Sequence, residues 1–209
     1  MNNGKAARAE EAPRFTRRIT WRRVDEEGEE EFGLLESDSA PHWILQGLVD
    51  FPVDDDKALW VRYLVACDAN WQTRRVLLAT ATNPLKLVDF PDVKPLITLT
   101  ADGMGNWSMN ERERPDLQGC LDVDLGCSPS TNTLPIRRLN LGAGESAEVT
   151  AAWVRFPDLS VQPLHQRYTR LAPHRYRYES LESSFTADLT VDNDGLVVDY
   201  PGGWRRTMG

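Results

Sequence analysis

Short runs in which apolar and polar residues alternate follow one another from about residue 15 to the end of the chain. Turn-forming residues separate these runs, which include "ALWVRYLVACD", "TRRVLLATAT", "ESAEVTAAWVRF" and "GLVVDY". A period of two is typical of β-strands with one face in a core, and no long stretch shows the 3.6-residue period of a helix. The pattern predicts a mainly β fold of antiparallel strands, curved enough to enclose a cleft, with one or two short helices.

The ends of this pattern set the expected domain boundaries. Residues 1–14 are polar, rich in Ala and Glu, and aperiodic, which predicts a disordered N-terminal tail. The remaining residues, 15–209, are enough for a single β domain. A charged run near the start, "DEEGEEE" from Asp25 to Glu31, is interpreted as a solvated hairpin turn around Gly28.

Alternation in "ALWVRYLVACD" assigns each residue to one of two faces. Leu59, Val61, Tyr63, Val65 and Cys67 share the face that should lie in the core, and the other face carries Trp60, Arg62, Leu64, Ala66 and Asp68. A surface that mixes Trp and Arg with small apolar residues suits the wall of a cleft, but another loop or sheet could also cover it. Two further observations are an echo of "ALWVRY" in the later stretch "AAWVRF", and "HRYRYES", which places Tyr176 and Tyr178 on one face.

Composition narrows the possible partners. The chain has a formal net charge of -8 and a pI of about 5.0, which is a poor match for nucleic acids or an anionic membrane surface. No run approaches the roughly 18 apolar residues of a membrane span, and the first residues lack the apolar core of a signal peptide. We therefore expect a cytoplasmic protein with no integral membrane association. The three cysteines and three histidines show neither a disulfide framework nor metal-ligand spacing, so no metal or cofactor is expected.

The stretch "CLDVDLGCSPSTNTLPIRRL" places two carboxylates on one face of a strand. Asp122 and Asp124 are two residues apart, so their side chains point the same way. Such a pair could act as acid and base, hold a cation, or accept hydrogen bonds from arginines. Pro135 suits the first turn of a short helix that would carry Arg137 and Arg138 at its end. This arrangement favours a charge-pinned connection in which at least one aspartate pairs with an arginine, with ligand binding and catalysis as the alternatives.

The same stretch carries a family resemblance. "GCLDVDLGCSPSTNTLPIRRL", with "YLVACDANWQTR" upstream and "YRYESLESSFTADLTVDNDGLVVDYPGGWRR" downstream, resembles the signature of a bacterial family labelled "putative glycolipid-binding". The resemblance covers most of the chain. It implies an open, curved sheet similar to the half-barrels of bacterial lipoprotein-localisation carriers, and it brings no set of catalytic residues.

Three functions remain open at this stage. The leading hypothesis is a non-enzymatic module that binds a small amphiphile, above all a glycolipid, in a β-sheet cleft. The alternatives are a carbohydrate-active hydrolase that uses Asp122 and Asp124, with Asp68 as a third carboxylate, and a protein-interaction scaffold that uses sheet edges; no G-x-S-x-G nucleophile motif is present. The predicted ligand-binding residues are Trp60, Arg62, Leu64, Asp68, Asp122, Asp124, Asn132, Arg137, Arg138, Tyr176 and Tyr178.

Overall fold

The structure, a computed structural model, describes residues 12–24, 27–54, 57–87, 89–90 and 92–209. Within these residues, fifteen strands form one sheet in the order β8-β7-β6-β5-β4-β3-β2-β1-β15-β14-β13-β12-β11-β10-β9. All neighbours are antiparallel except β9 and β10, which are parallel. The pairing of β1 with β15 joins two arms, an N-terminal arm of β1–β8 and a C-terminal arm of β9–β15.

The strands of the N-terminal arm are β1 (Arg14–Arg23), β2 (Glu29–Glu36), β3 (Trp43–Asp54), β4 (Lys57–Cys67), β5 (Thr73–Ala81), β6 (Ile97–Ala101), β7 (Trp107–Met109) and β8 (Arg112–Glu113). Those of the C-terminal arm are β9 (Asp122–Leu125), β10 (Ser146–Val154), β11 (Val161–Ala172), β12 (Arg175–Ser180), β13 (Thr186–Val191), β14 (Val197–Tyr200) and β15 (Trp204–Met208). The prediction of a mainly β fold with a curved, open, antiparallel-dominated sheet is confirmed.

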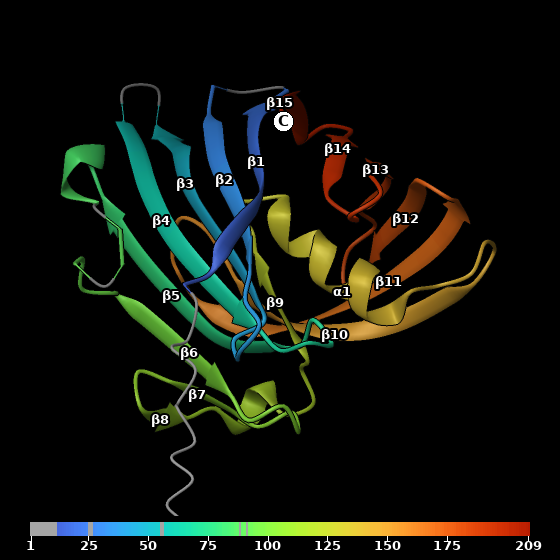
Figure 1. Ribbon diagram of the computed structural model, residues 1–209, viewed down its shortest axis with the longest axis horizontal. Helices are drawn as coiled ribbons and strands as arrows, with labels where there is room; N and C mark the ends of the chain where they lie inside the picture. Colours follow the sequence, from blue (N-terminus) through green and yellow to red (C-terminus); the bar gives the residue numbers. More distant parts are fainter. Residues whose placement is uncertain (1–11, 25–26, 55–56, 88, 91) are drawn as a thin grey trace, which may run out of the picture.

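A short helical segment lies between the two arms (Figure 1). It consists of the 3-10 turn η3 (Ser130–Asn132) and the helix α1 (Thr133–Leu139). The helix ends at Leu139, because the next residue, Asn140, has a left-handed backbone (φ 43°). Two further 3-10 turns are η1 (Pro84–Lys86) and η2 (Pro115–Leu117). The helical content is therefore small, as the pattern predicted.

Strand β9 ties the far edge of the C-terminal arm to the N-terminal arm. The backbone N–H of Thr73 donates to the Leu121 carbonyl at 3.1 Å, and the N–H of Val123 donates to Thr73 Oγ1 at 3.1 Å. Because Thr73 begins β5, these bonds fix the start of β9 against the N-terminal arm. The segment that follows β9 then enters the space between the arms.

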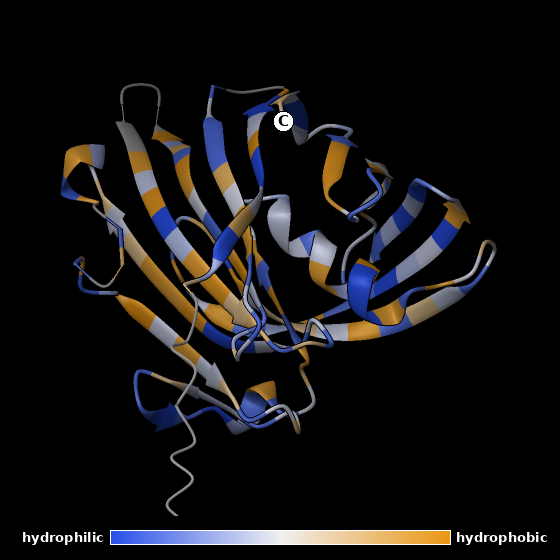
Figure 2. Cartoon of the chain, viewed as in Figure 1, coloured by the Kyte–Doolittle hydropathy of each residue, from blue (hydrophilic) through white to orange (hydrophobic). Residues whose placement is uncertain are grey.

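Alternation along the strands builds the core as predicted. In β4, Val61, Tyr63, Val65 and Cys67 are fully buried, whereas Arg62 and Leu64 between them keep partial exposure. Figure 2 shows the matching alternation of hydrophilic and hydrophobic colours along the strands. The core is one continuous cluster that includes residues from both arms and from α1.

Two further expectations concern the N-terminal tail and membrane spans. The predicted N-terminal tail, residues 1–14, falls mostly on residues 1–11, which lie outside the described residues, and β1 begins at Arg14. In the described part of the chain, no helix has the length and apolar character needed to cross a lipid bilayer.

Candidate functional site

A cavity of about 780 Å³, called the aromatic cavity here, lies on the face of the C-terminal arm that carries Asp124. Strand pairing explains its wall, because Asp124 of β9 is paired with Trp153 of β10, and Trp153 with Gln162 of β11. The β12–β13 loop, the turn between β14 and β15, and the end of β1 complete the lining. Its aromatic residues are Trp153, Tyr178, Phe185, Tyr200 and Trp204, and its polar residues include Arg23, Asp124, Asn132, Arg155, Gln162 and Glu182.

Three of the rings pack against one another and form one wall. The ring centroids of Tyr178 and Phe185 are 6.1 Å apart, those of Tyr178 and Tyr200 6.5 Å, and those of Phe185 and Tyr200 6.2 Å. Within this wall Tyr178 is buried, while Phe185 stays 47% exposed. The cluster therefore offers an apolar surface at the opening of the cavity, held in place by mutual ring contacts.

Asp124 faces this wall with one oxygen available. Gln166 Nε2 donates to Asp124 Oδ2 at 2.5 Å and also lies 3.2 Å from the Tyr178 hydroxyl. Among the described residues, none donates to Asp124 Oδ1. Burial raises the pKa of Asp124 to about 6, although the Gln166 hydrogen bond acts in the opposite direction. At neutral pH the cavity thus holds a half-buried carboxylate that can accept a hydrogen bond from a ligand.

Asp122 has a different role from Asp124. Arg138 Nε donates to Asp122 Oδ1 at 3.0 Å and Arg138 Nη2 to Oδ2 at 2.5 Å, and the Asp122 side chain is 1% exposed. Burial raises the pKa of Asp122, and the facing guanidinium opposes that shift. The prediction that one of the two aspartates pairs with an arginine is confirmed. Since both oxygens of Asp122 are engaged away from solvent, a hydrolase that uses Asp122 and Asp124 together is not supported.

A buried polar cluster lies behind the cavity. Ser128 Oγ, at the cavity wall, donates to Glu30 Oε1 at 2.8 Å, and the Tyr63 hydroxyl donates to the same oxygen. Tyr63 also contacts Ser130 Oγ at 2.7 Å. Burial raises the pKa of Glu30 to about 8, so this carboxyl is mostly protonated at neutral pH.

Glu30 corrects one expectation from the sequence. The run "DEEGEEE" was interpreted as solvated, and Asp25 and Glu26 lie outside the described residues, but Glu30 is fully buried. Glu30 points inward because it belongs to β2, where its neighbours in the pairing are Trp21 and Val49, both fully buried.

The polar residues from the end of β9 to the first residue of α1 stabilise this connection by hydrogen bonds. Thr131 Oγ1 accepts from the Leu125 N–H at 3.2 Å, and Thr133 Oγ1 donates to the Gly195 carbonyl at 3.1 Å. Asn132 Oδ1 accepts from the Tyr168 hydroxyl at 2.9 Å, while Asn132 Nδ2 donates to the Pro129 carbonyl at 3.1 Å. These bonds join the segment to β9, to β11 and to the β13–β14 turn, so its hydroxyl and amide groups serve the architecture.

Comparison with known families matches residues 18–206 to one described as "Putative glycolipid-binding". The chain belongs to this family. It is also similar to a crystal structure of a DUF1089 family protein from Pseudomonas aeruginosa, with 34% sequence identity and a TM-score of 0.73 over 88% of this chain and 94% of the other. A search of curated proteins found no match. The resemblance drawn from the sequence motifs is confirmed.

The structure distributes the predicted site residues over several places. Asp124, Asn132 and Tyr178 line the aromatic cavity, and the Asp122–Arg138 pair lies next to Asp124 along β9. Arg137 and Tyr176 line a second cavity at the opposite ends of β11 and β12.

The β4 residues lie elsewhere. Trp60, Arg62 and Leu64 alternate with the fully buried face of β4 and point the other way. There, Arg62 Nη2 donates to the Leu87 carbonyl at 3.2 Å and Nη1 pairs with Asp89 at 2.9 Å, so the segment after β5 contacts this face.

Asp68 holds the turn between β4 and β5. Its Oδ1 accepts from the N–H groups of Asn70 at 2.8 Å and Gln72 at 3.0 Å, and its Oδ2 pairs with Arg74 at 2.7 Å. Trp60, Leu64 and Asp68 are not part of the aromatic cavity.

Several lining residues were not predicted. Trp153 and Arg155 come from "AAWVRF", the echo of the β4 stretch, and Tyr200 and Trp204 come from the end of the downstream family motif, "VVDYPGGWRR". The sequence signal for these residues was the presence of aromatic side chains in the two motifs. Alternation alone, however, does not show which of two similar strands faces the cavity. Among the described residues, no group of three or more His, Cys, Asp or Glu side chains is placed to hold a metal ion.

Proposed function

We propose that the protein binds an amphiphile with a sugar headgroup in the aromatic cavity and does not transform it. The description of the family supports the ligand class. The observation that carries the proposal is the position of Asp124, which presents a half-buried carboxylate oxygen toward a wall of aromatic rings. This combination separates a polar recognition group from an apolar surface within one cavity.

Each part of the wall has a matching part in such a ligand. Aromatic rings stack on the apolar faces of sugars or contact an alkyl chain, and Phe185 places an exposed ring where the chain would leave the cavity. Asp124 Oδ1 accepts a hydrogen bond from a sugar hydroxyl, and Gln162 provides a further polar group on the same cavity wall. A cavity of about 780 Å³ is within the range of small-molecule sites, roughly 300–1,000 Å³.

The test is calorimetric titration of the full chain with a long-chain alkyl glycoside below its critical micelle concentration. Two comparison ligands are the free sugar and a zwitterionic detergent of the same chain length. We expect saturable binding of the glycoside and weaker binding of both comparison ligands. Asp124→Ala should weaken glycoside binding by about tenfold or more, as expected for loss of a charge-assisted hydrogen bond.

The matched control is Asp199→Ala, which removes a partly exposed carboxylate paired with Arg205 outside the cavity lining. It should leave glycoside binding unchanged. Absence of saturable binding for every amphiphile would contradict the proposal, and equal effects of the two aspartate variants would remove Asp124 from the site.

A further inference from the structure

The second cavity, called the arginine cavity here, has a volume of about 390 Å³. It lies beside the turn between β11 and β12, whereas the aromatic cavity lies near the other ends of these strands. Gln162 in the first and Arg170 in the second are eight residues apart on β11, which corresponds to roughly 26 Å along a strand. The side chains that matter here are Trp71, Arg137, Asn140, Arg170, His174 and Tyr176.

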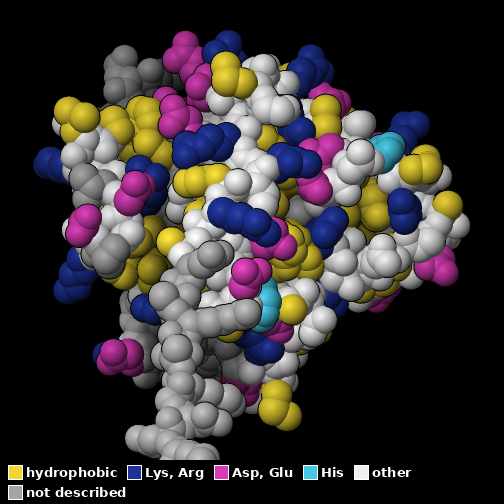
Figure 3. Space-filling model, in the orientation of Figure 1, with side chains coloured by type: hydrophobic (Ala, Val, Ile, Leu, Met, Phe, Trp, Pro, Cys, Tyr) yellow, Lys and Arg dark blue, Asp and Glu magenta, His cyan; other side chains and the backbone are white. Residues whose placement is uncertain are grey.

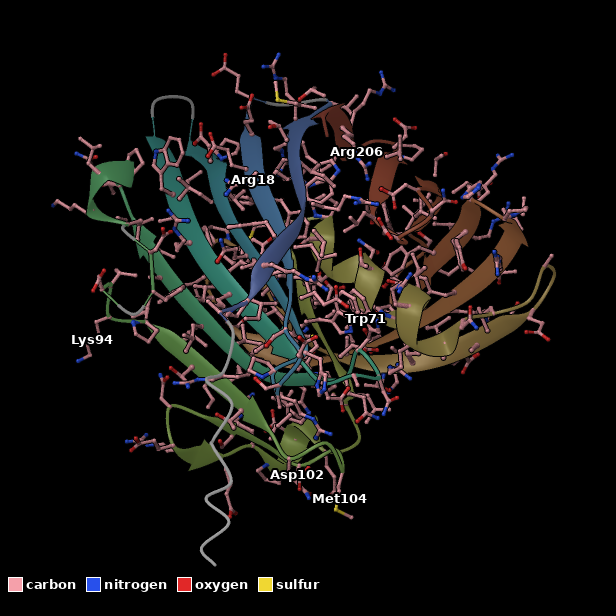
Figure 4. All side chains as sticks on the ribbon, in the orientation of Figure 1. Arg18, Trp71, Lys94, Asp102, Met104 and Arg206 are labelled. Atoms are coloured by element: carbon pink, nitrogen blue, oxygen red, sulfur yellow. The ribbon has the colours of Figure 1, made fainter. Side chains whose placement is uncertain are left out.

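Arg137 is held in this cavity by its aromatic and backbone surroundings. Its guanidinium carbon lies 5.0 Å from the centroid of Trp71, which is itself stacked on Trp43. Gly195 leaves the room that the Arg137 stem occupies, because a Cβ at Gly195 would lie 3.2 Å from Arg137 Cδ. Figure 4 labels Trp71 beside α1, near the centre of the molecule. No side chain among the described residues forms an ion pair with Arg137, so its guanidinium retains its donors for a ligand.

Arg170 places a second guanidinium on the wall. Its Nη1 donates to the Leu141 carbonyl at 2.7 Å and its Nη2 to the Pro173 carbonyl at 3.1 Å, and the group lies 5.7 Å from the Tyr176 ring. These partners are neutral, and the buried Nε of Arg170 has no acceptor among the described residues. Arg170 therefore keeps its positive charge without a neighbouring carboxylate partner.

One carboxylate, that of Asp192, also lines the arginine cavity, but it is already engaged. Arg206 Nη1 pairs with Asp192 Oδ2 at 2.9 Å, and Asp192 Oδ1 accepts from the N–H groups of Asp194 at 2.9 Å and Leu196 at 3.0 Å. Elsewhere on the visible face, Lys and Arg side chains are interspersed with Asp and Glu side chains (Figure 3). The arginine cavity is different, because two guanidinium groups line it without a carboxylate of their own.

We propose that the arginine cavity binds a phosphoryl group, either as inorganic phosphate or as a phosphate monoester. A guanidinium is planar and presents paired N–H donors that match phosphate oxygens, and stacking on Trp71 fixes the orientation of Arg137. Asn140 and His174 add polar groups to the same wall. The site is separate from the aromatic cavity and does not depend on the function proposed there.

The experiment is isothermal titration of the full chain, in a chloride buffer, with inorganic phosphate and separately with glycerol 3-phosphate. We expect saturable binding of at least one of the two. Arg137→Gln should weaken it at least about tenfold, which is the effect expected when a hydrogen bond to a charged group is lost. The matched control is Arg112→Gln on β8, an exposed arginine outside both cavities that removes the same charge. It should change the affinity less than twofold.

A second variant covers the case in which Arg137→Gln fails to fold. His174 is exposed in the β11–β12 turn, so His174→Gln should leave the melting temperature unchanged and weaken phosphate binding severalfold. Tighter binding of glycerol 3-phosphate assigns the group to a phosphate monoester, and tighter binding of inorganic phosphate assigns it to the free ion. The proposal is overturned if neither ligand binds saturably to the wild-type chain. It is equally overturned if Arg112→Gln weakens binding as much as Arg137→Gln or, where Arg137→Gln does not fold, if His174→Gln leaves binding unchanged.

Discussion

Strand β4 and the segment that ends β10 have nearly the same sequence, "LWVRY" at residues 59–63 and "AWVRF" at residues 152–156, of which the last two residues follow β10. The side chains of the two segments nevertheless lie in different places. In β4 the Trp60 and Arg62 face lies opposite the buried face, and Arg62 is bound by the segment after β5. Trp153 of β10 and Arg155, which directly follows that strand, line the aromatic cavity. Alternation therefore identifies residues that share a face, but the neighbours of a strand decide where that face points.

The two similar segments differ at their last residue, and this difference gives them different buried contacts. Tyr63 in β4 corresponds to Phe156 after β10, and only Tyr63 carries a hydroxyl that needs buried partners. Glu30 of β2 supplies one partner, and Ser128 and Ser130 supply the others from the segment that follows β9. Phe156 instead packs its ring 5.8 Å from that of Phe51. The polar cluster thus fixes the inward face of β4, while β9 fixes the orientation of β10.

The largest expected effect on stability comes from removing the ion pair between Asp122 of β9 and Arg138 of α1. Arg138→Ala leaves the 1% exposed Asp122 carboxylate without its partner, which should lower the free energy of unfolding by about 3–5 kcal/mol at pH 7. Urea unfolding measures this loss. Arg205→Ala breaks an exposed pair with Asp199 and should cost only about 0–1 kcal/mol. If the two variants lose equal stability, the Asp122–Arg138 pair does not hold β9 beside β10.

The second effect concerns the polar cluster that directs β4. The pKa of Glu30 is about 8 in the folded chain and 4.5 for an ordinary glutamate, so above pH 4.5 the folded state holds a proton that the unfolded chain releases. Stability should therefore fall as pH rises, and between pH 6 and pH 8 this one group contributes about 2 kcal/mol of the loss. Urea unfolding at several pH values measures the slope.

Two variants test the origin of that slope. Glu30→Gln keeps the shape of the protonated carboxyl and should flatten the fall between pH 6 and pH 8. Glu29→Gln, at the exposed ion pair with Arg22, should leave the slope as in the wild-type chain. A wild-type slope that persists in Glu30→Gln would show that Glu30 is ionised in the folded protein.

The third effect compares the two tryptophans directly. Trp153→Ala removes a ring from the cavity wall and should weaken binding of the alkyl glycoside by about tenfold, or about 1.4 kcal/mol. Trp60→Ala removes a similarly half-buried ring from the other strand and should leave glycoside binding within twofold. Calorimetric titration gives both values. A larger effect of Trp60→Ala would transfer the site to the face of β4.

These comparisons also show what the sequence could predict. The alternating runs predicted the sheet, and Pro135 with two following arginines predicted a short helix and an ion pair between one of the two aspartates and an arginine. These signals act over short distances along the chain, but only the structure shows that the pair is Asp122 with Arg138. The environment of Glu30 was not predictable in this way, since its partner Ser128 lies 98 residues further on. From the sequence, a carboxyl in an acidic run is expected to be solvated. Only the fold shows that Glu30 is buried beside the hydroxyls of Tyr63 and Ser128.

The aromatic cavity was beyond reach for the same reason. Trp153, Phe185 and Tyr200 come from three separate elements, and each alone has the pattern of an ordinary core or turn residue. Asp124 was identified because it shares a face with Asp122, yet only the structure separates a carboxylate bound by Arg138 from one bound by Gln166. Local pattern names candidate groups, and long-range packing assigns their roles.

The smallest expected effect is a pH dependence that separates Asp124 from every other carboxylate. Its pKa of about 6 means that the group is ionised at pH 7.5 and mostly protonated at pH 5. A protonated carboxyl is a weaker acceptor for a sugar hydroxyl, so affinity for the alkyl glycoside should fall severalfold as pH decreases through 6. Asp124→Asn keeps an acceptor oxygen but cannot titrate, and it should bind with an affinity that is lower at pH 7.5 and constant with pH. Asp102→Asn, in the turn after β6 (Figure 4), should keep the wild-type dependence. A pH profile that is unchanged in Asp124→Asn would mean that the ligand contacts the cavity without using this carboxylate, and that recognition depends on the aromatic wall alone.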